Sequence, residues 1–124
     1  MAAPFATAIQ IAQSIRDGST TASAVLEQHL ARISEREGEI HAFNLVTTEQ
    51  ARATAQHIDE QAKAGNALGA LAGVPVALKD NMCTRGIATT CSSKILEGWK
   101  PPYDATVVTR LQQAGAVMVG KTNL

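Results

Sequence analysis

The 124-residue sequence lacks the features that define several large classes of protein. Its formal net charge is zero, with 11 basic and 11 acidic residues, whereas a free-standing nucleic-acid binder gains affinity from an excess of Lys and Arg. It has no apolar run near the ~18 residues of a transmembrane helix. Residues 1–5 show no basic region followed by an apolar block, as a secretory signal would. We therefore expect a cytoplasmic protein without a membrane anchor.

Motifs for metals and phosphates are missing as well. Cys83 and Cys91 form no C-x-x-C pair, and the three histidines, His29, His41 and His57, do not cluster with them. A zinc site requires four well-spaced ligands. The scattered glycines form no phosphate-binding loop. We therefore expect two reduced thiols, no metal and no cofactor in this chain.

Aromatic residues are scarce, at 3% of the chain, and the 45% of hydrophobic residues is rich in alanine. The length allows at most one domain of the common size of about 150 residues. Because an alanine side chain is small, each core residue buries little apolar surface. This composition is a first indication that the chain is not self-sufficient.

The first half of the chain is predicted to be helical. Apolar residues recur at helical spacing before Gly18, Gly38 and Gly65, in the segments 8–15, 25–33 and 51–62. Thr20 or Thr21 is expected to cap the second helix, and Thr47 to Gln50 matches a capping box for the third. A short extended segment, 42–46, is expected between the second and third helices.

The second half has a different pattern. Residues 71–78 (LAGVPVAL) are nearly all apolar, which is typical of a strand buried on both faces, although Pro75 counts against a central strand. Asp104 is expected to cap a further helix. A second apolar run, 116–119, ends at Gly120. Strand, crossover helix and strand predict a βαβ unit with two parallel strands.

Two lysines close these strands, where open α/β sheets bind ligands. Lys79 follows the first run directly and Lys121 follows the second. Burial of a lysine favours the neutral amine that a general base needs, and Asp80 or Asn81 could orient or pair Lys79. For both lysines, and more strongly for Lys121, the simpler interpretation is a solvated side chain at a strand end.

Candidate nucleophiles are poor. Ser92 and Ser93 lie in the loop after the first strand, where hydroxyls more often cap a short turn such as 94–96 or satisfy loop amides. No G-x-S-x-G elbow is present, and no histidine lies close in sequence to Cys91. The residues alone therefore provide a candidate base without a convincing nucleophile.

Four stretches carry a resemblance to a known family. Residues 73–81 (GVPVALKDN) resemble the amidase signature family. Residues 86–96 (GIATTCSSKIL), 101–108 (PPYDATVV) and 114–123 (AGAVMVGKTN) narrow the resemblance to the glutamine-hydrolysing subunits of aspartyl/glutamyl-tRNA amidotransferases. The earlier helical segments match the N-terminal region of these subunits, so the resemblance covers essentially the whole chain.

The resemblance implies an α/β fold made of the N-terminal helices and first strands of the amidase signature fold, an incomplete mixed sheet flanked by helices. Residues 1–124 would form the N-terminal part of a single amidase domain. Within it, residues 1–67 would be a helical region and residues 68–124 a βαβ-like region that carries the catalytic lysine.

The family uses a Ser–cis-Ser–Lys triad, in which the lysine is the base, the bridging serine relays the proton and the second serine attacks the amide carbon. By motif match, Lys79 is the catalytic lysine. In the family, the two serines follow the GKTN element in a Gly/Ser-rich segment, which would lie beyond Leu124. We therefore expect the 124-residue chain to be inactive alone.

The resemblance also implies partners. In the complete enzymes this subunit hydrolyses glutamine and supplies ammonia, with which a partner subunit converts Glu-tRNA(Gln) to Gln-tRNA(Gln) or Asp-tRNA(Asn) to Asn-tRNA(Asn). The implied partners are subunits B and C and misacylated tRNA, and the whole complex uses ATP and Mg. Two alternatives stay open: an amidase-signature hydrolase of another amide, and a truncated, non-catalytic interaction module that docks through its open sheet edge.

Overall fold

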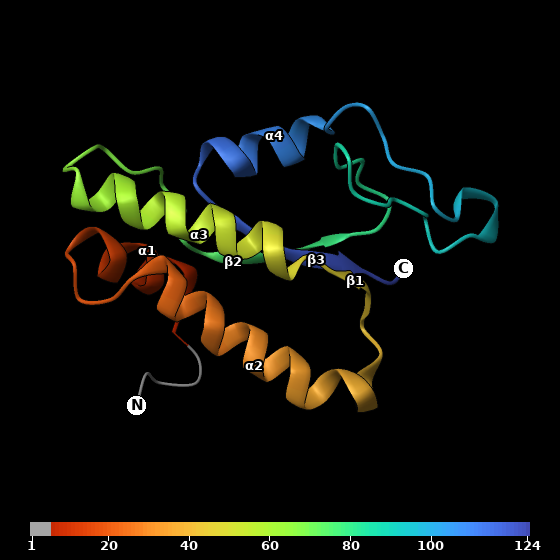
Figure 1. Ribbon diagram of the computed structural model, residues 1–124, viewed down its shortest axis with the longest axis horizontal. Coiled ribbons are helices and arrows are strands. Elements are labelled where there is room, and N and C mark those ends of the chain that lie inside the picture. The colour runs from red at the N-terminus through yellow and green to blue at the C-terminus, as the bar shows by residue number, and fades with distance from the viewer. Residues whose placement is uncertain (1–5) are drawn as a thin grey trace.

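The computed structural model describes residues 6–124 and consists of a three-stranded sheet with helices around it (Figure 1). The elements in chain order are α1 (Ala8–Arg16), α2 (Ala22–Ile40), β1 (Phe43–Val46), α3 (Thr48–Lys63), β2 (Pro75–Lys79), the 3₁₀ helix η1 (Lys94–Leu96), α4 (Thr106–Gln113) and β3 (Val117–Thr122). Residues 1–5, where the sequence shows no secretory signal, lie outside the described part. Within residues 6–124, no helix is long and apolar enough to cross a membrane.

The first two helices begin as their sequences predict. Thr7 and Gln10 form a capping box at α1, in which each side chain accepts a hydrogen bond from the other's backbone N–H. The Thr21 hydroxyl caps α2 by accepting from the Ala24 N–H. However, α2 runs past Gly38 and ends at His41, which adopts a left-handed conformation. A single helical glycine costs only about 1 kcal/mol, which is too little to end a long helix.

Two predicted caps are wrong because the side chains bind elsewhere. The Thr47 hydroxyl does not cap α3 and instead donates to the backbone carbonyl of Met118 in β3, at 3.0 Å. Asp104 does not cap α4 and instead accepts from the Arg85 N–H at 2.7 Å. Both side chains therefore join segments that are distant in the sequence.

The sheet is mixed, with the strand order β1-β3-β2. The central strand β3 pairs antiparallel with β1 and parallel with β2, which confirms the predicted parallel pair. Figure 1 shows α4 on the opposite side of the strands from α2. The expectation that the first strand is buried on both faces is wrong, because Ala77 and Lys79 are exposed while Leu78 is buried. The strand also begins later than expected, at Pro75, a position in a strand where proline is tolerated.

Gly120 lies inside β3 and does not end the strand, contrary to the sequence expectation. A Cβ atom at this position would collide with the backbone carbonyl of Leu45 and would lie 2.7 Å from the ring of Phe43. Glycine is therefore required here because the paired strand β1 approaches β3 very closely at this irregular point of the register.

The core lies between the helices and the sheet and is built largely from small side chains. Its alanines come from α1, α2, α3 and the segment before β2, and its larger members come from these same segments and from β3. Buried members are Ile11, Ala12, Ile15, Ala22, Val25, Leu26, Ala51, Ala55, Ile58, Ala72, Val74, Val117 and Val119. In α3 the buried face consists of Ala51, Ala55 and Ile58, which lie within the predicted apolar segment 51–62.

Replacement of Gly120 by alanine is expected to destabilise the fold by about 1–3 kcal/mol, because the added methyl group meets a backbone carbonyl that cannot move without breaking the β1–β3 pairing. The matched control is Gly38→Ala in α2, where nothing lies within 4 Å of the new Cβ atom. That variant is expected to gain roughly 0.5–1 kcal/mol. Urea denaturation measures both changes, and an unchanged stability of Gly120→Ala would contradict the close approach of β1.

Candidate functional site

The candidate site lies at the carboxyl ends of the parallel strands β2 and β3. Leu78 pairs with Lys121 and Lys79 with Thr122, so the two lysines come from neighbouring strands at the same edge. The connection from Asp80 to Ala105 leaves this edge and returns to α4, and Figure 1 shows it projecting beyond the strand ends. The topology therefore brings together the residues that the sequence singled out.

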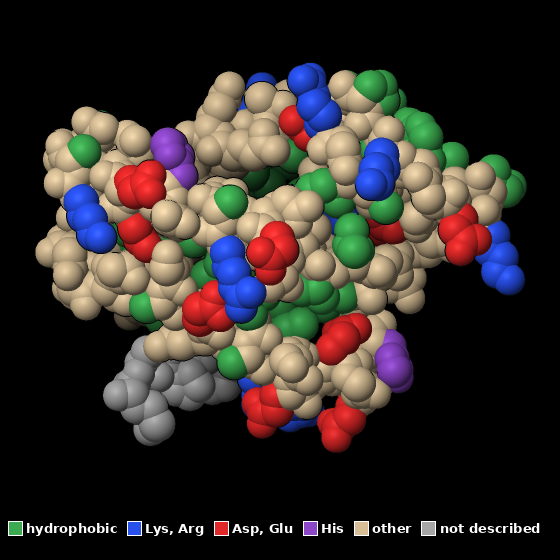
Figure 2. Space-filling view, in the orientation of Figure 1, with side chains coloured by type: hydrophobic (Ala, Val, Ile, Leu, Met, Phe, Trp, Pro, Cys, Tyr) green, Lys and Arg blue, Asp and Glu red, His purple; other side chains and the backbone are tan. Residues whose placement is uncertain are grey.

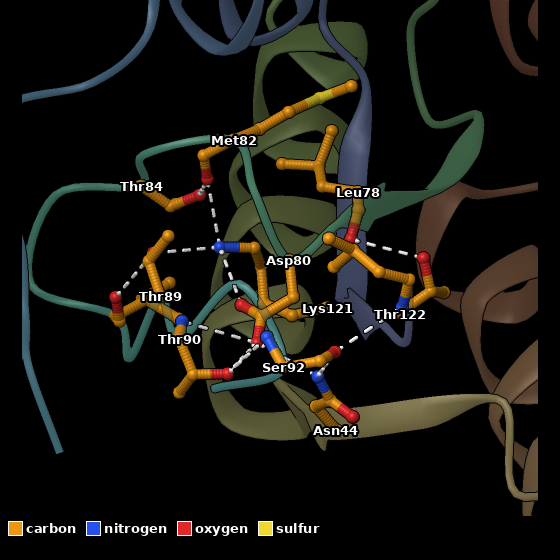
Figure 3. Close-up of polar contacts among 12 residues, drawn as sticks. Asn44, Leu78, Asp80, Met82, Thr84, Thr89, Thr90, Ser92, Lys121 and Thr122 are labelled. Atoms are coloured by element: carbon orange, nitrogen blue, oxygen red, sulfur yellow. Dashed lines mark hydrogen bonds and ion pairs between the residues drawn. The ribbon is translucent and has the colours of Figure 1, made fainter. Parts of the chain in front are cut away.

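Lys121 is completely buried, with 0% of its surface exposed. Its ammonium donates to the Met82 carbonyl at 2.9 Å and to the Thr89 hydroxyl at 2.8 Å, and it forms an ion pair with the Asp80 carboxylate at 3.4 Å (Figure 3). The interpretation of Lys121 as a solvated strand-end lysine is wrong. Three oxygen partners replace the water that a buried ammonium loses.

Asp80 is the partner of Lys121 and is also buried, with 1% exposed. One carboxylate oxygen accepts hydrogen bonds from the Thr90 hydroxyl at 2.5 Å and the Asn44 amide at 2.9 Å. Burial alone would raise the pKa of the Asp80 carboxyl, but hydrogen bonds from Thr90 and Asn44 and the charge of Lys121 outweigh it. The pKa is held below its ordinary value. Asp80 is therefore a charged carboxylate.

Lys79 is exposed, so the expected partial burial is not found among the described residues. Asp80 follows it directly, but its carboxylate is directed to Lys121 and not to Lys79. Consecutive residues of an extended strand point to opposite sides, and the pair Lys79 and Asp80 follows this rule. The Lys79 amine is consequently held at the strand end without a carboxylate partner in residues 6–124.

The serines of the loop have structural roles, as the sequence analysis expected. The Ser93 hydroxyl accepts from the Ile95 N–H and caps η1. The Ser92 hydroxyl accepts from the Asn44 amide at 3.0 Å and donates to the Asn123 side chain at 2.7 Å. Because its proton is already committed to Asn123, Ser92 is a poor nucleophile in this arrangement.

The loop contains a strained turn next to Asp80. Cys91 and Ser92 have φ values of 51° and 53°, in the left-handed region. The Ser93 N–H donates to the Thr90 carbonyl at 2.9 Å and closes the turn, which is the geometry of a type I′ turn that ordinarily favours Gly and Asn. The Cys91 N–H also donates to the Asp80 carbonyl at 2.9 Å. Asp80 thus holds the turn through its backbone as well as its side chain.

Other features of the described residues add no competing site. Residues 6–124 contain no cluster of three or more His, Cys, Asp or Glu side chains suited to a metal ion, and Cys83 and Cys91 are free. A groove of about 290 Å³ lies between the end of α2 and β1, lined partly by Arg32 and Arg36. Both arginines pair within α2, with Glu35 and Glu39. Figure 2 shows acidic and basic side chains interspersed over one face of the molecule.

Sequence reasoning singled out Lys79 and the edge of the sheet where it lies, but missed the residues that organise that edge. Lys121 was assigned to solvent, no role was predicted for Asn44, and Thr89 and Thr90 were noted only as part of the stretch 86–96 that carries the resemblance. A signal did exist, because Lys121 continues a strand of apolar residues directly after Gly120. A charged residue in such a position requires a buried partner, which Asp80 supplies.

Comparisons with known proteins give a consistent result. A family model described as Amidase matches residues 24–124. The chain is 53% identical over 112 residues to the A subunit of a Glutamyl-tRNA(Gln) amidotransferase from Synechococcus sp. (strain CC9605), covering 90% of this chain and 23% of that protein. The corresponding subunit from Cutibacterium acnes is 52% identical over 118 residues, covering 95% and 24%. The chain thus spans about a quarter of the length of these curated relatives.

Solved structures share the fold. The peptide amidase from Stenotrophomonas maltophilia superposes with a TM-score of 0.91 at 30% sequence identity, covering 98% of this chain and 25% of that one. A structure described as a vestigial protein complex that reveals the origins of an s-triazine catabolic enzyme gives a TM-score of 0.92 at 38% identity, covering 96% and 26%. The α/β arrangement expected from the sequence is confirmed by these similarities.

Loss of either partner of the buried ion pair is expected to destabilise the fold strongly. Lys121→Met and Asp80→Asn each leave one buried charge without its counter-charge, at a cost of about 3–5 kcal/mol, whereas the double variant should recover much of that loss. The control is Arg52→Met, which breaks the exposed pair between Arg52 and Glu27 and should change little. Urea denaturation at pH 7 measures all four variants, and additive effects of the two single changes would argue against the pair.

The lowered pKa of Asp80 also predicts a loss of stability in acid. The folded protein holds the Asp80 proton more weakly than the unfolded chain, whose carboxyl has the ordinary pKa of about 4. The stabilising contribution is therefore complete above that pH and is lost as the pH falls through the folded-state value. Between pH 7 and pH 3, the free energy of unfolding should decrease more steeply in the wild type than in Asp80→Asn. Parallel curves would contradict this assignment.

Proposed function

The chain belongs to the amidase signature family, and we propose that its residues serve the glutamine-hydrolysing subunit of a tRNA-dependent amidotransferase. The observation that carries the proposal is the 53% identity, over 90% of the chain, with a relative named as the A subunit of the Glutamyl-tRNA(Gln) amidotransferase. The peptide amidase at 30% identity is a more distant relative with another substrate in its name. Identity at this level favours glutamine over other amides.

We assign the role of general base to Lys79. The residue lies at the carboxyl end of a parallel strand, where ligands bind in open α/β sheets. Its amine is free of carboxylate partners among the described residues because Asp80 is engaged by Lys121. The amine is therefore not committed to an ion pair and is available to exchange a proton with a neighbouring hydroxyl.

The proposed reaction is a serine acyl transfer. A bridging serine gives its proton to the Lys79 amine and takes one from the nucleophilic serine, whose oxygen attacks the amide carbon of glutamine. The amide nitrogen receives the proton that Lys79 accepted as its bond to carbon breaks and leaves as ammonia, and water then hydrolyses the acyl-enzyme to glutamate. Ser92 and Ser93 supply neither serine, because their hydroxyls stabilise the loop and cap η1. We propose that both serines lie outside residues 1–124.

The remaining parts of the proposal concern the whole enzyme. Residues 1–124 would form the N-terminal part of one amidase domain, divided near residue 67 into a helical region and the region that carries Lys79. Subunits B and C would receive the ammonia and bind the misacylated tRNA. The whole complex would act as a ligase that uses ATP and Mg, and it would lie in the cytoplasm. The chain has a net charge of zero and no phosphate-binding loop, which supports the proposal that the partner subunits bind tRNA and ATP.

Lys79→Ala in the complete subunit, assembled with its partners, is expected to lower the rate of ammonia release from glutamine by about 100-fold to 10,000-fold, the usual contribution of a general base. The matched control is Lys94→Ala, which removes an exposed lysine of η1 and should leave the rate unchanged. The 124-residue chain alone should release no ammonia. Turnover that survives Lys79→Ala would refute the assignment.

The same assay separates the alternatives. Lys79-dependent cleavage of other amides, with glutamine left intact, would favour an amide hydrolase of different specificity. If the complete subunit hydrolyses no amide, and the 124-residue chain is a monomer that melts in one sharp cooperative transition, a non-catalytic interaction module would be favoured. Size-exclusion chromatography and thermal denaturation of the 124-residue chain provide those two measurements.

A further inference from the structure

The direction of Lys79 is set by its neighbour. The Asp80 N–H donates to the Thr122 carbonyl at 2.9 Å, which continues the β2–β3 ladder one residue past the end of β2. Asp80 is 1% exposed, whereas the preceding Lys79 is exposed. Because consecutive side chains of an extended segment point to opposite sides, the burial of Asp80 fixes the side on which the Lys79 amine emerges.

Lys121 is the group that fixes Asp80. Its ammonium contacts three separate points of the connection after β2, namely the carboxylate of Asp80, the carbonyl of Met82 and the hydroxyl of Thr89 (Figure 3). The Lys121 side chain comes from the central strand, which is paired on both sides. The central strand of the sheet therefore holds the start and the middle of the loop at once.

The strained turn depends on the same pair. Cys91 and Ser92 occupy left-handed conformations, which residues other than glycine keep only where the surroundings over-determine them. Part of the constraint comes from Asp80, which binds the Thr90 hydroxyl with its carboxylate and the Cys91 N–H with its carbonyl. Asn44 and Asn123 also bind the Ser92 hydroxyl, but loss of a charged, fixed Asp80 would remove the contacts that hold Thr90 and Cys91.

We propose that Asp80 and Lys121 are positioning residues for the amidase reaction: their buried ion pair fixes both the side on which Lys79 emerges and the Thr90–Ser93 turn beside it. This inference rests on the proposed function, in which Lys79 is the base. Neither residue touches the reacting atoms, since both are buried behind the strand end. Their effect is on the geometry of proton transfer, which is sensitive to displacements of about 1 Å.

The test compares stability with turnover in the complete enzyme, using the double variant Asp80→Asn/Lys121→Met. The double variant removes both buried charges together, so its melting temperature should lie near that of the wild type. A purely structural role would then restore activity as well. A positioning role instead predicts that kcat for glutamine hydrolysis stays about 10- to 100-fold below the wild type, with KM changed by less than about threefold.

Two further variants make the result interpretable. Thr89→Val keeps both charges and removes one acceptor of the Lys121 ammonium, so it should fold and show a smaller decrease in kcat. It serves as the test if the double variant does not fold. Arg52→Met, which breaks an exposed ion pair between α2 and α3, should keep the wild-type kcat.

The possible outcomes distinguish the two proposals. A kcat within twofold of the wild type in both folded variants, while Lys79→Ala abolishes turnover, would overturn the positioning role and leave the proposed function intact. If Lys79→Ala itself retains full turnover, the proposed function fails and the positioning role falls with it. A lower kcat at unchanged stability, with Lys79 essential, supports both.

Discussion

The buried ion pair between Lys121 and Asp80 is the constraint on which the candidate site of this chain depends. A lysine that is 0% exposed must be solvated by the protein itself. Its oxygen partners are therefore drawn from the loop that leaves β2, and the loop is pinned against the end of β3. Because the Lys121 ammonium needs hydrogen-bond acceptors, it constrains the backbone of the loop between Asp80 and Thr89.

The close approach of the paired strand β1 to β3 supplies the remaining side of this arrangement. Because Gly120 has no side chain, β1 lies against β3 at a distance that a methyl group would not allow. Asn44, in the middle of β1, can then reach the Asp80 carboxylate at 2.9 Å and the Ser92 hydroxyl at 3.0 Å. The missing side chain at Gly120 thus allows one of the hydrogen bonds that, after the one from Thr90, lower the pKa of Asp80.

The sequence predicted the features that depend on local pattern. The helices of residues 8–16 and 48–63 and the parallel pair of strands follow from periodicity and glycine positions, and the motif around Lys79 identified the family. The predictions that were wrong concern side chains whose partners are distant in the sequence. Thr47 and Asp104 were assigned to local caps but bind Met118 and Arg85. Lys121 was assigned to solvent for the same reason, since its partners are 32 to 41 positions away along the chain.

The exposure of Lys79 adds a condition to the proposed chemistry. Water stabilises an ammonium, so a lysine serves as a base only where the water around it is displaced. On the described residues, the side that carries Ala77 and Lys79 is open, while the opposite side is held by Asp80 and Lys121. The described residues therefore fix where the Lys79 amine emerges. The water around that amine must be displaced by another segment that packs over the same side. A base that is positioned by one segment and desolvated by another becomes active only when the two are assembled.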